Sequence, residues 1–192
     1  MTEPFEGAGF RLRRATPDDA EFLANLAANE EISPFLAVLS PRDTDAFLDE
    51  IEAAEASPHE RGRFVIEAVG EDEAWRAGSI AFEVTNRRSR IVHLYGLMLD
   101  PRFRGRGLAR AATELFTSHL IRDLNFHRVE LECYGYNERA VLHFGRSGFV
   151  KEGVKRKAYW RNGEWVDGVL FALVREDLDE TPSASASPRR GS

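Results

Sequence analysis

The sequence is poor in cysteine, in long apolar runs and in positive charge. Cys133 is the single cysteine among 192 residues, so an intrachain disulfide and a thiolate metal cluster within one chain are both excluded. No segment approaches the roughly 20 apolar residues of a membrane-spanning helix. The amino-terminal stretch MTEPFEGAGF lacks the basic start and the apolar run of a signal peptide. These absences predict a soluble cytoplasmic protein in a reducing compartment, with no membrane partner.

Acidic residues outnumber basic ones, with 32 Asp and Glu against 26 Lys and Arg and a formal net charge of -6. This balance disfavours nonspecific nucleic-acid binding, since DNA and RNA backbones attract basic proteins, and mildly favours cationic partners. The composition, 43% hydrophobic and 30% charged, suits one folded domain with its own core. We expect that domain over residues 10–178, a flexible amino terminus over 1–9 and a disordered tail over 179–192.

The hydrophobic period changes several times along the chain. Apolar residues at helical spacing predict helices over residues 20–28, 43–55, 108–124 and 138–146. Alternating apolar residues predict strands over residues 11–16, 64–69, 77–84, 91–99, 127–133, 149–160 and 165–175. The three central strands form an antiparallel meander in this interpretation. The apolar loop over residues 32–36 either packs onto the core or walls a substrate pocket.

The most specific signal is a glycine-spaced loop between a strand and the long third helix. The strand breaks at Asp100-Pro101, and Gly105 and Gly107 then let the chain turn so that unpaired N–H groups converge at the helix start. The helix dipole and nearby arginines make this an anion site suited to phosphate, against the alternative of a solvated basic helix start. The dinucleotide pattern G-x-G-x-x-G fails at Arg110, and no Gly-Lys pair exists for a P-loop.

Three motifs in order resemble the GNAT superfamily of acyl-CoA-dependent N-acyltransferases. Arg104-Gly-Arg-Gly-Leu-Ala109 is similar to its Q/R-x-x-G-x-G/A pyrophosphate loop. Asn137-Glu-Arg-Ala140 and Ser147-Gly-Phe-Val-Lys-Glu-Gly153 are similar to its N-x-x-A/S and G-F-x-x-E-G signature. The segment from Trp160 to about residue 173 resembles the closing hairpin of the ribosomal-protein alanine and spermidine acetyltransferase branches. The resemblance implies an α/β fold (mixed α+β) with a mostly antiparallel, twisted sheet of about seven strands, splayed at the acyl-CoA site and flanked by about four helices.

The resemblance also implies the cosubstrate, acetyl-CoA, and the residues that bind it, with no metal. The backbone of the strand before the loop would pair with the pantetheine arm, and one of its N–H groups would stabilise charge on the thioester oxygen. Asn137 would hydrogen-bond the same arm, and its alternative role is a helix cap. The complete set of predicted cofactor-binding residues is Leu97, Met98, Leu99, Arg104, Gly105, Arg106, Gly107, Leu108, Ala109, Arg110 and Asn137.

The catalytic candidate is Glu132, which stands where N-terminal alanine acetyltransferases of this family carry a glutamate base. An amine must lose a proton before it attacks a thioester, so a base or a water relay is required. Glu130 and Glu132 share one face of a strand, and the alternative is a merely solvated acidic face. His93 and Glu83 are further candidates for the base, each with a structural alternative.

The chain departs from the family pattern at Phe144, where many members carry a tyrosine that protonates the leaving thiolate. Phenylalanine donates no proton, although a thiol with a pKa of roughly 8.5 leaves readily near neutral pH. Four residues remain open as substitutes: Tyr134, Tyr136, His143 and Ser147.

Two functions follow as hypotheses. The first is acetyl-CoA-dependent N-acetylation of a primary amine, on a protein N-terminus, a polyamine or an amine-bearing small molecule. The second is a catalytically silent acyl-CoA-binding module that regulates a partner, which Phe144 favours. Pairing of the terminal strands across subunits is compatible with a homodimer, and no nucleic-acid partner is expected.

Overall fold

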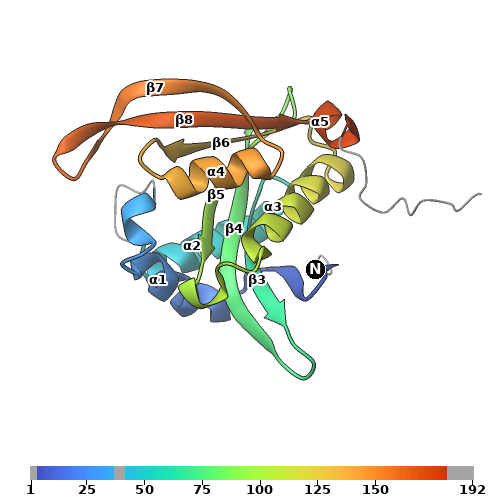
Figure 1. Cartoon of the computed structure of the whole chain (residues 1–192). Coiled ribbons are helices and arrows are strands. Elements are labelled where there is room, and N and C mark those ends of the chain that lie inside the picture. The colour runs from blue at the N-terminus through green and yellow to red at the C-terminus, as the bar shows by residue number, and fades with distance from the viewer. Residues whose placement is uncertain (1–3, 37–41, 181–192) are drawn as a thin grey trace, which may run out of the picture.

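The computed structural model describes residues 4–36 and 42–180 (Figure 1). These residues form an eight-stranded sheet with the strand order β1-β2-β3-β4-β5-β6-β8-β7. The strands are β1 (Phe5–Gly7), β2 (Phe10–Arg14), β3 (Arg61–Val69), β4 (Ala74–Asn86), β5 (Ile91–Leu99), β6 (Arg128–Tyr134), β7 (Val150–Arg161) and β8 (Glu164–Val174). The α-helices are α1 (Ala20–Ala28), α2 (Thr44–Ala56), α3 (Leu108–Ser118), α4 (Glu138–Arg146) and α5 (Arg175–Glu180).

The predicted mixed α/β class with a mostly antiparallel sheet is confirmed, and the element count is slightly higher than expected. The additional strand, β1, pairs with β2 from Phe5↔Leu12 to Gly7↔Phe10. It lies within residues 1–9, which were expected to be flexible. The sequence does not predict this strand because three residues are too few to show an alternating pattern. The additional helix, α5, crosses the predicted domain boundary at residue 178. The predicted tail beyond residue 180 lies outside the described residues.

Side-chain caps begin two of the helices. Asp43 accepts a hydrogen bond from the Ala46 amide at 2.9 Å at the start of α2, and Asn137 accepts one from the Ala140 amide at 3.1 Å at the start of α4. Each cap satisfies an amide that the first helical turn leaves unpaired. The predicted long third helix is α-helical only to Ser118 and continues as a π-helical turn, His119–Asp123.

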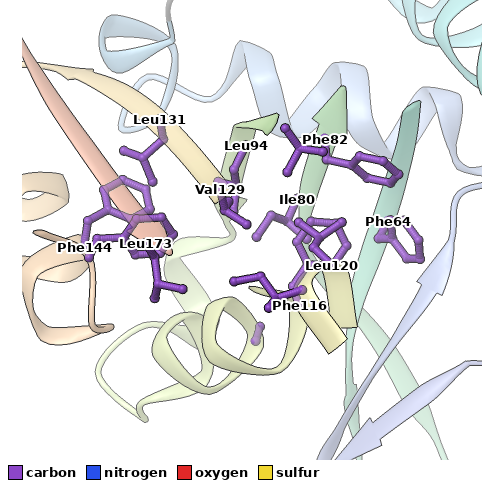
Figure 2. Close-up of a cluster of buried hydrophobic side chains, with 14 of the residues drawn as sticks. Phe64, Ile80, Phe82, Leu94, Phe116, Leu120, Val129, Leu131, Phe144 and Leu173 are labelled. Carbon is purple, nitrogen blue, oxygen red and sulfur yellow. The ribbon is translucent and has the colours of Figure 1, made fainter. Parts of the chain in front are cut away.

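Helices cover both faces of the sheet (Figure 1). On one face α3 and α4 pack on an aromatic-rich core in which the Phe64 and Phe116 rings meet edge to face at 5.0 Å (Figure 2). On the other face α1 and α2 pack on a second cluster that includes Val65. Phe64 and Val65 are consecutive in β3 and serve opposite cores, because side chains alternate across a strand. Both faces of the central strands are therefore buried by packed side chains.

The strands part in the middle of the sheet, between β5 and β6. This pair is the one parallel pair in the described sheet, and its register runs only from Ile91↔Arg128 to His93↔Glu130. Beyond that point β5 continues to Leu99 and β6 to Tyr134, with no pairing between them in the described residues. Each strand keeps its outer partner, β4 or β8. Backbone groups of β5 thus face a gap rather than a neighbouring strand, as the resemblance implied.

Candidate active site

The loop after β5 is shaped to present backbone amides. The Asp100 carboxylate accepts hydrogen bonds from the Arg102 amide at 2.9 Å and from the Arg102 guanidinium at 2.7 Å, and this contact lowers the pKa of Asp100. Gly105 and Gly107 have φ angles of +78° and +76°, a left-handed conformation that side chains with a Cβ adopt at a cost. Gly107 caps α3, so the unpaired amides of the first helical turn follow it directly.

A cavity of about 730 Å³ opens beside this loop. All of the predicted cofactor-binding residues line it except Arg106. Arg106 is exposed and instead borders a separate cavity that includes Trp75. The sequence motifs and the unpaired edge of β5 therefore meet in one place, with Asn137 among the residues that line it.

The segment after α1 closes one side of this cavity. Glu31 pairs with the Arg104 guanidinium at 2.5 Å, and the Tyr136 hydroxyl donates to the Pro34 carbonyl at 2.6 Å. The Phe35 ring lies 5.8 Å from the Tyr136 ring. Of the two interpretations of the apolar loop over residues 32–36, the structure supports both in part, since Ile32 is buried and also lines the cavity wall.

A smaller cavity of about 230 Å³ adjoins the first, where β5 and β6 diverge. Leu97, Asn137 and Phe144 are among the residues that line both cavities. The walls found only in the smaller one include His93, Glu132 and the rings of other aromatic residues. The two spaces together have one end at the glycine turn that starts α3, a shared middle at the strand gap and a second end at Glu132.

Glu132 is held by two donors from β7. The Lys155 ammonium lies 2.6 Å from Oε2, and the Tyr159 hydroxyl donates to Oε1 at 2.7 Å. The hydrogen bond to Glu132 raises the pKa of Lys155, and burial followed by the same hydrogen bond raises the pKa of Tyr159. The Glu132 side chain is 17% exposed, so it is not a freely solvated acid. Glu130, by contrast, bonds Thr85 and Arg128 and lines neither cavity.

The other candidates for the base are placed differently. His93 borders the smaller cavity and stacks on Tyr95 at 6.4 Å between ring centroids. Glu83 pairs across from His93 in the β4–β5 ladder, is exposed and lines neither cavity.

A buried arginine, Arg63, lies beside the segment of β5 that borders the gap. The Arg63 side chain is 1% exposed, and it donates from Nε to Glu50 at 2.8 Å and from Nη1 to the Ser79 hydroxyl at 3.0 Å. Ser79 in turn donates to the Gly96 carbonyl at 3.1 Å. Burial lowers the pKa of Arg63 to about 10, against the opposing effect of the Tyr95 hydroxyl. This network was missed in the sequence, because an arginine inside a strand normally marks a solvated face.

The network fixes a bulge in β5. The β4–β5 register shifts between Ser79↔Met98 and Ala81↔Tyr95, and Gly96 takes a φ of +60° at that point. A Cβ at Gly96 would lie 2.8 Å from Arg63 Nη2. The bulge sets the direction of the amides at Leu97 and Met98, which border the gap.

Replacing Gly96 by alanine is therefore expected to lower the free energy of unfolding by about 1–3 kcal/mol, through a left-handed backbone and a contact with an immovable guanidinium. The same change should reduce turnover more than stability alone explains. Urea unfolding and steady-state assays measure both. Gly163→Ala is the control, because Gly163 has a φ of +83° with nothing within 4 Å of its would-be Cβ. Equal effects of the two variants on turnover would contradict the role of the bulge.

Chain comparisons identify the family. A family model described as the acetyltransferase (GNAT) domain matches residues 10–150. The chain belongs to the GNAT acetyltransferase family. It is 33% identical to the L-amino acid N-acetyltransferase AaaT of Escherichia coli K12 over 89 residues, which are 46% of this chain and 54% of that protein. The match thus spans about half the length of this curated relative, as it does for two further curated relatives from Bacillus subtilis.

Solved structures agree on the fold. The ribosomal-protein-S5-alanine acetyltransferase from Vibrio fischeri superposes with a TM-score of 0.77 at 23% identity, covering 92% of this chain and 98% of that one. The spermidine N-acetyltransferase from Vibrio cholerae, in complex with CoA and spermine, has a TM-score of 0.76 at 22% identity, covering 88% and 97%. In the described residues, no helix is long and apolar enough to cross a membrane, and no group of three metal-ligating side chains is gathered.

Proposed function

We propose that this GNAT protein transfers an acetyl group from acetyl-CoA to a primary amine by direct attack. The observation that carries the proposal is the continuity of the two cavities: an amide-rich helix start at one end, an unpaired strand edge in the middle and Glu132 at the other end. The names of the relatives, which act on an L-amino acid, a ribosomal-protein alanine and spermidine, support an amine acceptor.

The residues present fit acetyl-CoA. Nothing lies within 4 Å of a would-be Cβ at Gly105 or Gly107, so a pyrophosphate can approach their backbone closely. Leu97, Met98 and Leu99 would pair with the pantetheine arm, and Asn137, whose amide oxygen caps α4, keeps its side-chain NH₂ for the same arm. The bound thioester supplies an activated acyl group.

Glu132 serves as the base in this proposal. Its carboxylate takes a proton from the acceptor amine, so that the nitrogen lone pair can form a bond to the acetyl carbon. A backbone N–H at the β5 bulge stabilises the negative charge that develops on the carbonyl oxygen. As the carbon–sulfur bond breaks, the electron pair would move to sulfur, which takes up a proton, and the nitrogen loses its second proton to solvent to give the neutral amide.

The hydrogen bonds of the four candidate residues indicate which of them can donate the proton that the sulfur takes up. The Tyr136 hydroxyl donates to the Pro34 carbonyl, and the Ser147 hydroxyl donates to the His143 carbonyl. Burial lowers the pKa of His143, so its ring is neutral near pH 7. Its Nε2 hydrogen points at Thr113 Oγ1, which already donates to a carbonyl. Tyr134 is different: its oxygen accepts from Arg161 at 2.6 Å, and its hydrogen goes to no described group. Tyr134 also lines the smaller cavity, so we assign the proton to it.

Changing Tyr134 to phenylalanine is expected to lower kcat about tenfold at neutral pH, a modest loss because a thiol with a pKa of about 8.5 is already a fair leaving group. The loss should shrink as the pH rises past that value, since the thiolate then needs no proton. A pH profile of kcat for both enzymes measures this. A loss independent of pH would point to a packing role for the ring.

The proposed function is tested by release of free CoA from acetyl-CoA, with acceptor panels of amino acids, N-terminal peptides, polyamines and aminoglycosides, and with acetyl-CoA binding measured by calorimetry. Amine-dependent release is the expected result. Tight binding without release from any acceptor would favour the acyl-CoA-binding regulatory module, which Phe144 at the junction of the two cavities supports. Absence of binding would overturn both.

A further inference from the structure

The smaller cavity has an unusual charge balance for a site that receives an amine. Glu132 is the one carboxylate among the described residues that line it. Two cations from β7 stand against that wall: Lys155 on the Glu132 carboxylate and Arg161 on the Tyr134 hydroxyl at 2.6 Å. The Arg161 guanidinium also lies 5.0 Å from the centroid of the Tyr134 ring. Lys155 and Arg161 do not line the cavity themselves, and the one carboxylate of its described wall is already paired with Lys155.

This balance opposes an acceptor with several positive charges. A polyamine gains affinity from carboxylates spaced along its length, and the described wall of the smaller cavity offers only Glu132, which Lys155 already pairs. Bringing a second ammonium close to Lys155 costs electrostatic free energy. The single carboxylate is already paired and does not offset that cost.

Resting on the proposed function, we infer that the acceptor is an α-amino acid, whose amine faces Glu132 while its carboxylate takes donors from Lys155. One carbon separates the two groups in such a molecule. The Lys155 ammonium and the Glu132 carboxylate are neighbours at 2.6 Å, so the site offers the complementary pair of charges at matching spacing.

Lys155 is suited to this second contact. Its ammonium has three N–H donors and its side chain is 49% exposed, so it can swing to a ligand without leaving a buried charge unpaired. An acceptor carboxylate would compete with Glu132 for those donors. Glu132 would then have an oxygen free to accept the amine proton, which couples recognition of the acceptor to readiness of the base.

The test compares L-alanine with L-alaninamide, which differ chiefly in the carboxylate charge, in wild type and in Lys155→Met. The ratio of their kcat/KM values is taken for each enzyme, and the quotient of the two ratios cancels the different intrinsic reactivity of the two amines. We expect the wild-type ratio to favour the amino acid about tenfold more than the variant ratio does, the usual size of a hydrogen bond to a partly exposed charge. Lys157→Met is the matched control, since Lys157 is an exposed lysine on the same strand; its ratio should match wild type.

Each outcome bears on one claim. A quotient near one, or spermidine as the best acceptor, would overturn the amino-acid assignment while leaving amine acetylation standing. Binding of acetyl-CoA without turnover from any acceptor would instead count against the proposed function. A change in Lys157→Met as large as that in Lys155→Met would show that general surface charge, rather than the Glu132 pair, selects the acceptor.

Discussion

Changing Glu132 to glutamine should lower kcat by about 10²–10⁴-fold, the usual contribution of a positioned base, while leaving the dissociation constant of acetyl-CoA almost unchanged. The separation is expected because Glu132 lines only the smaller cavity, and most of the predicted acetyl-CoA contacts lie in the larger one, with Leu97 and Asn137 shared between the two. Glutamine keeps the shape and a hydrogen-bond acceptor for Tyr159 but cannot take a proton. CoA release and calorimetry measure the two quantities.

Two further variants sharpen that result. Glu130→Gln removes a carboxylate from the same face of β6, two residues earlier, and should alter kcat less than twofold because Glu130 lines neither cavity. Gly168→Ala leaves Glu132 in place but adds a methyl group that would collide with its Oε1 and approach the Tyr159 ring to 2.8 Å. The carboxylate must then move, so kcat should fall. Full turnover in Glu132→Gln would remove Glu132 from the mechanism.

Changing Glu50 to alanine should lower the free energy of unfolding by about 3–5 kcal/mol, because it strips the counter-ion from a buried cation. Arg63 is 1% exposed and Glu50 accepts its Nε hydrogen at 2.8 Å, while Glu50 also receives the Tyr95 hydroxyl at 3.0 Å and pairs with Arg42. Arg63 Nη2 already has no hydrogen-bond partner in the described structure. Urea unfolding followed by circular dichroism measures the loss.

The control for this change is Glu114→Ala, which breaks an exposed i,i+4 pair with Arg110 and should cost about 0.5 kcal/mol or less. A second arm replaces both buried partners, with Glu50→Leu and Arg63→Met together. Apolar residues of similar volume need no counter-ion, so the double variant should recover most of the lost stability. A loss below about 1 kcal/mol in Glu50→Ala would show that water or another acceptor reaches Arg63.

The sequence predicts much of this fold because its strongest signals are local. The helix over residues 138–146 has the predicted bounds, since a side-chain cap starts it and a strict apolar stripe continues it. The turn at Gly105 and Gly107 can likewise be predicted from the sequence, because only a residue without a Cβ takes those φ angles freely. Neither signal needs knowledge of residues elsewhere in the chain.

The parts that sequence reasoning missed depend on distant residues. Lys155 and Tyr159 reach Glu132 from 23 and 27 positions away, through the β6–β8–β7 order of the sheet. Arg63 meets Glu50 across a helix–sheet contact and Gly96 across a bulge. Hydrophobic periodicity carries no information on such long-range contacts. A sequence pattern can therefore indicate Glu132 as a candidate, but it cannot identify the side chains that bind it.

The gap between β5 and β6 separates two regions that constrain mutation differently. A cosubstrate bound by main-chain amides, as we propose for acetyl-CoA, makes few demands on side-chain identity, so mutations can accumulate along that wall as long as the backbone keeps its path. The proposed acceptor end is lined mainly by side chains of β5, β6 and β7, where a single codon change alters charge or shape. Descendants of such a chain can exchange one amine for another while the acyl donor and the architecture stay the same.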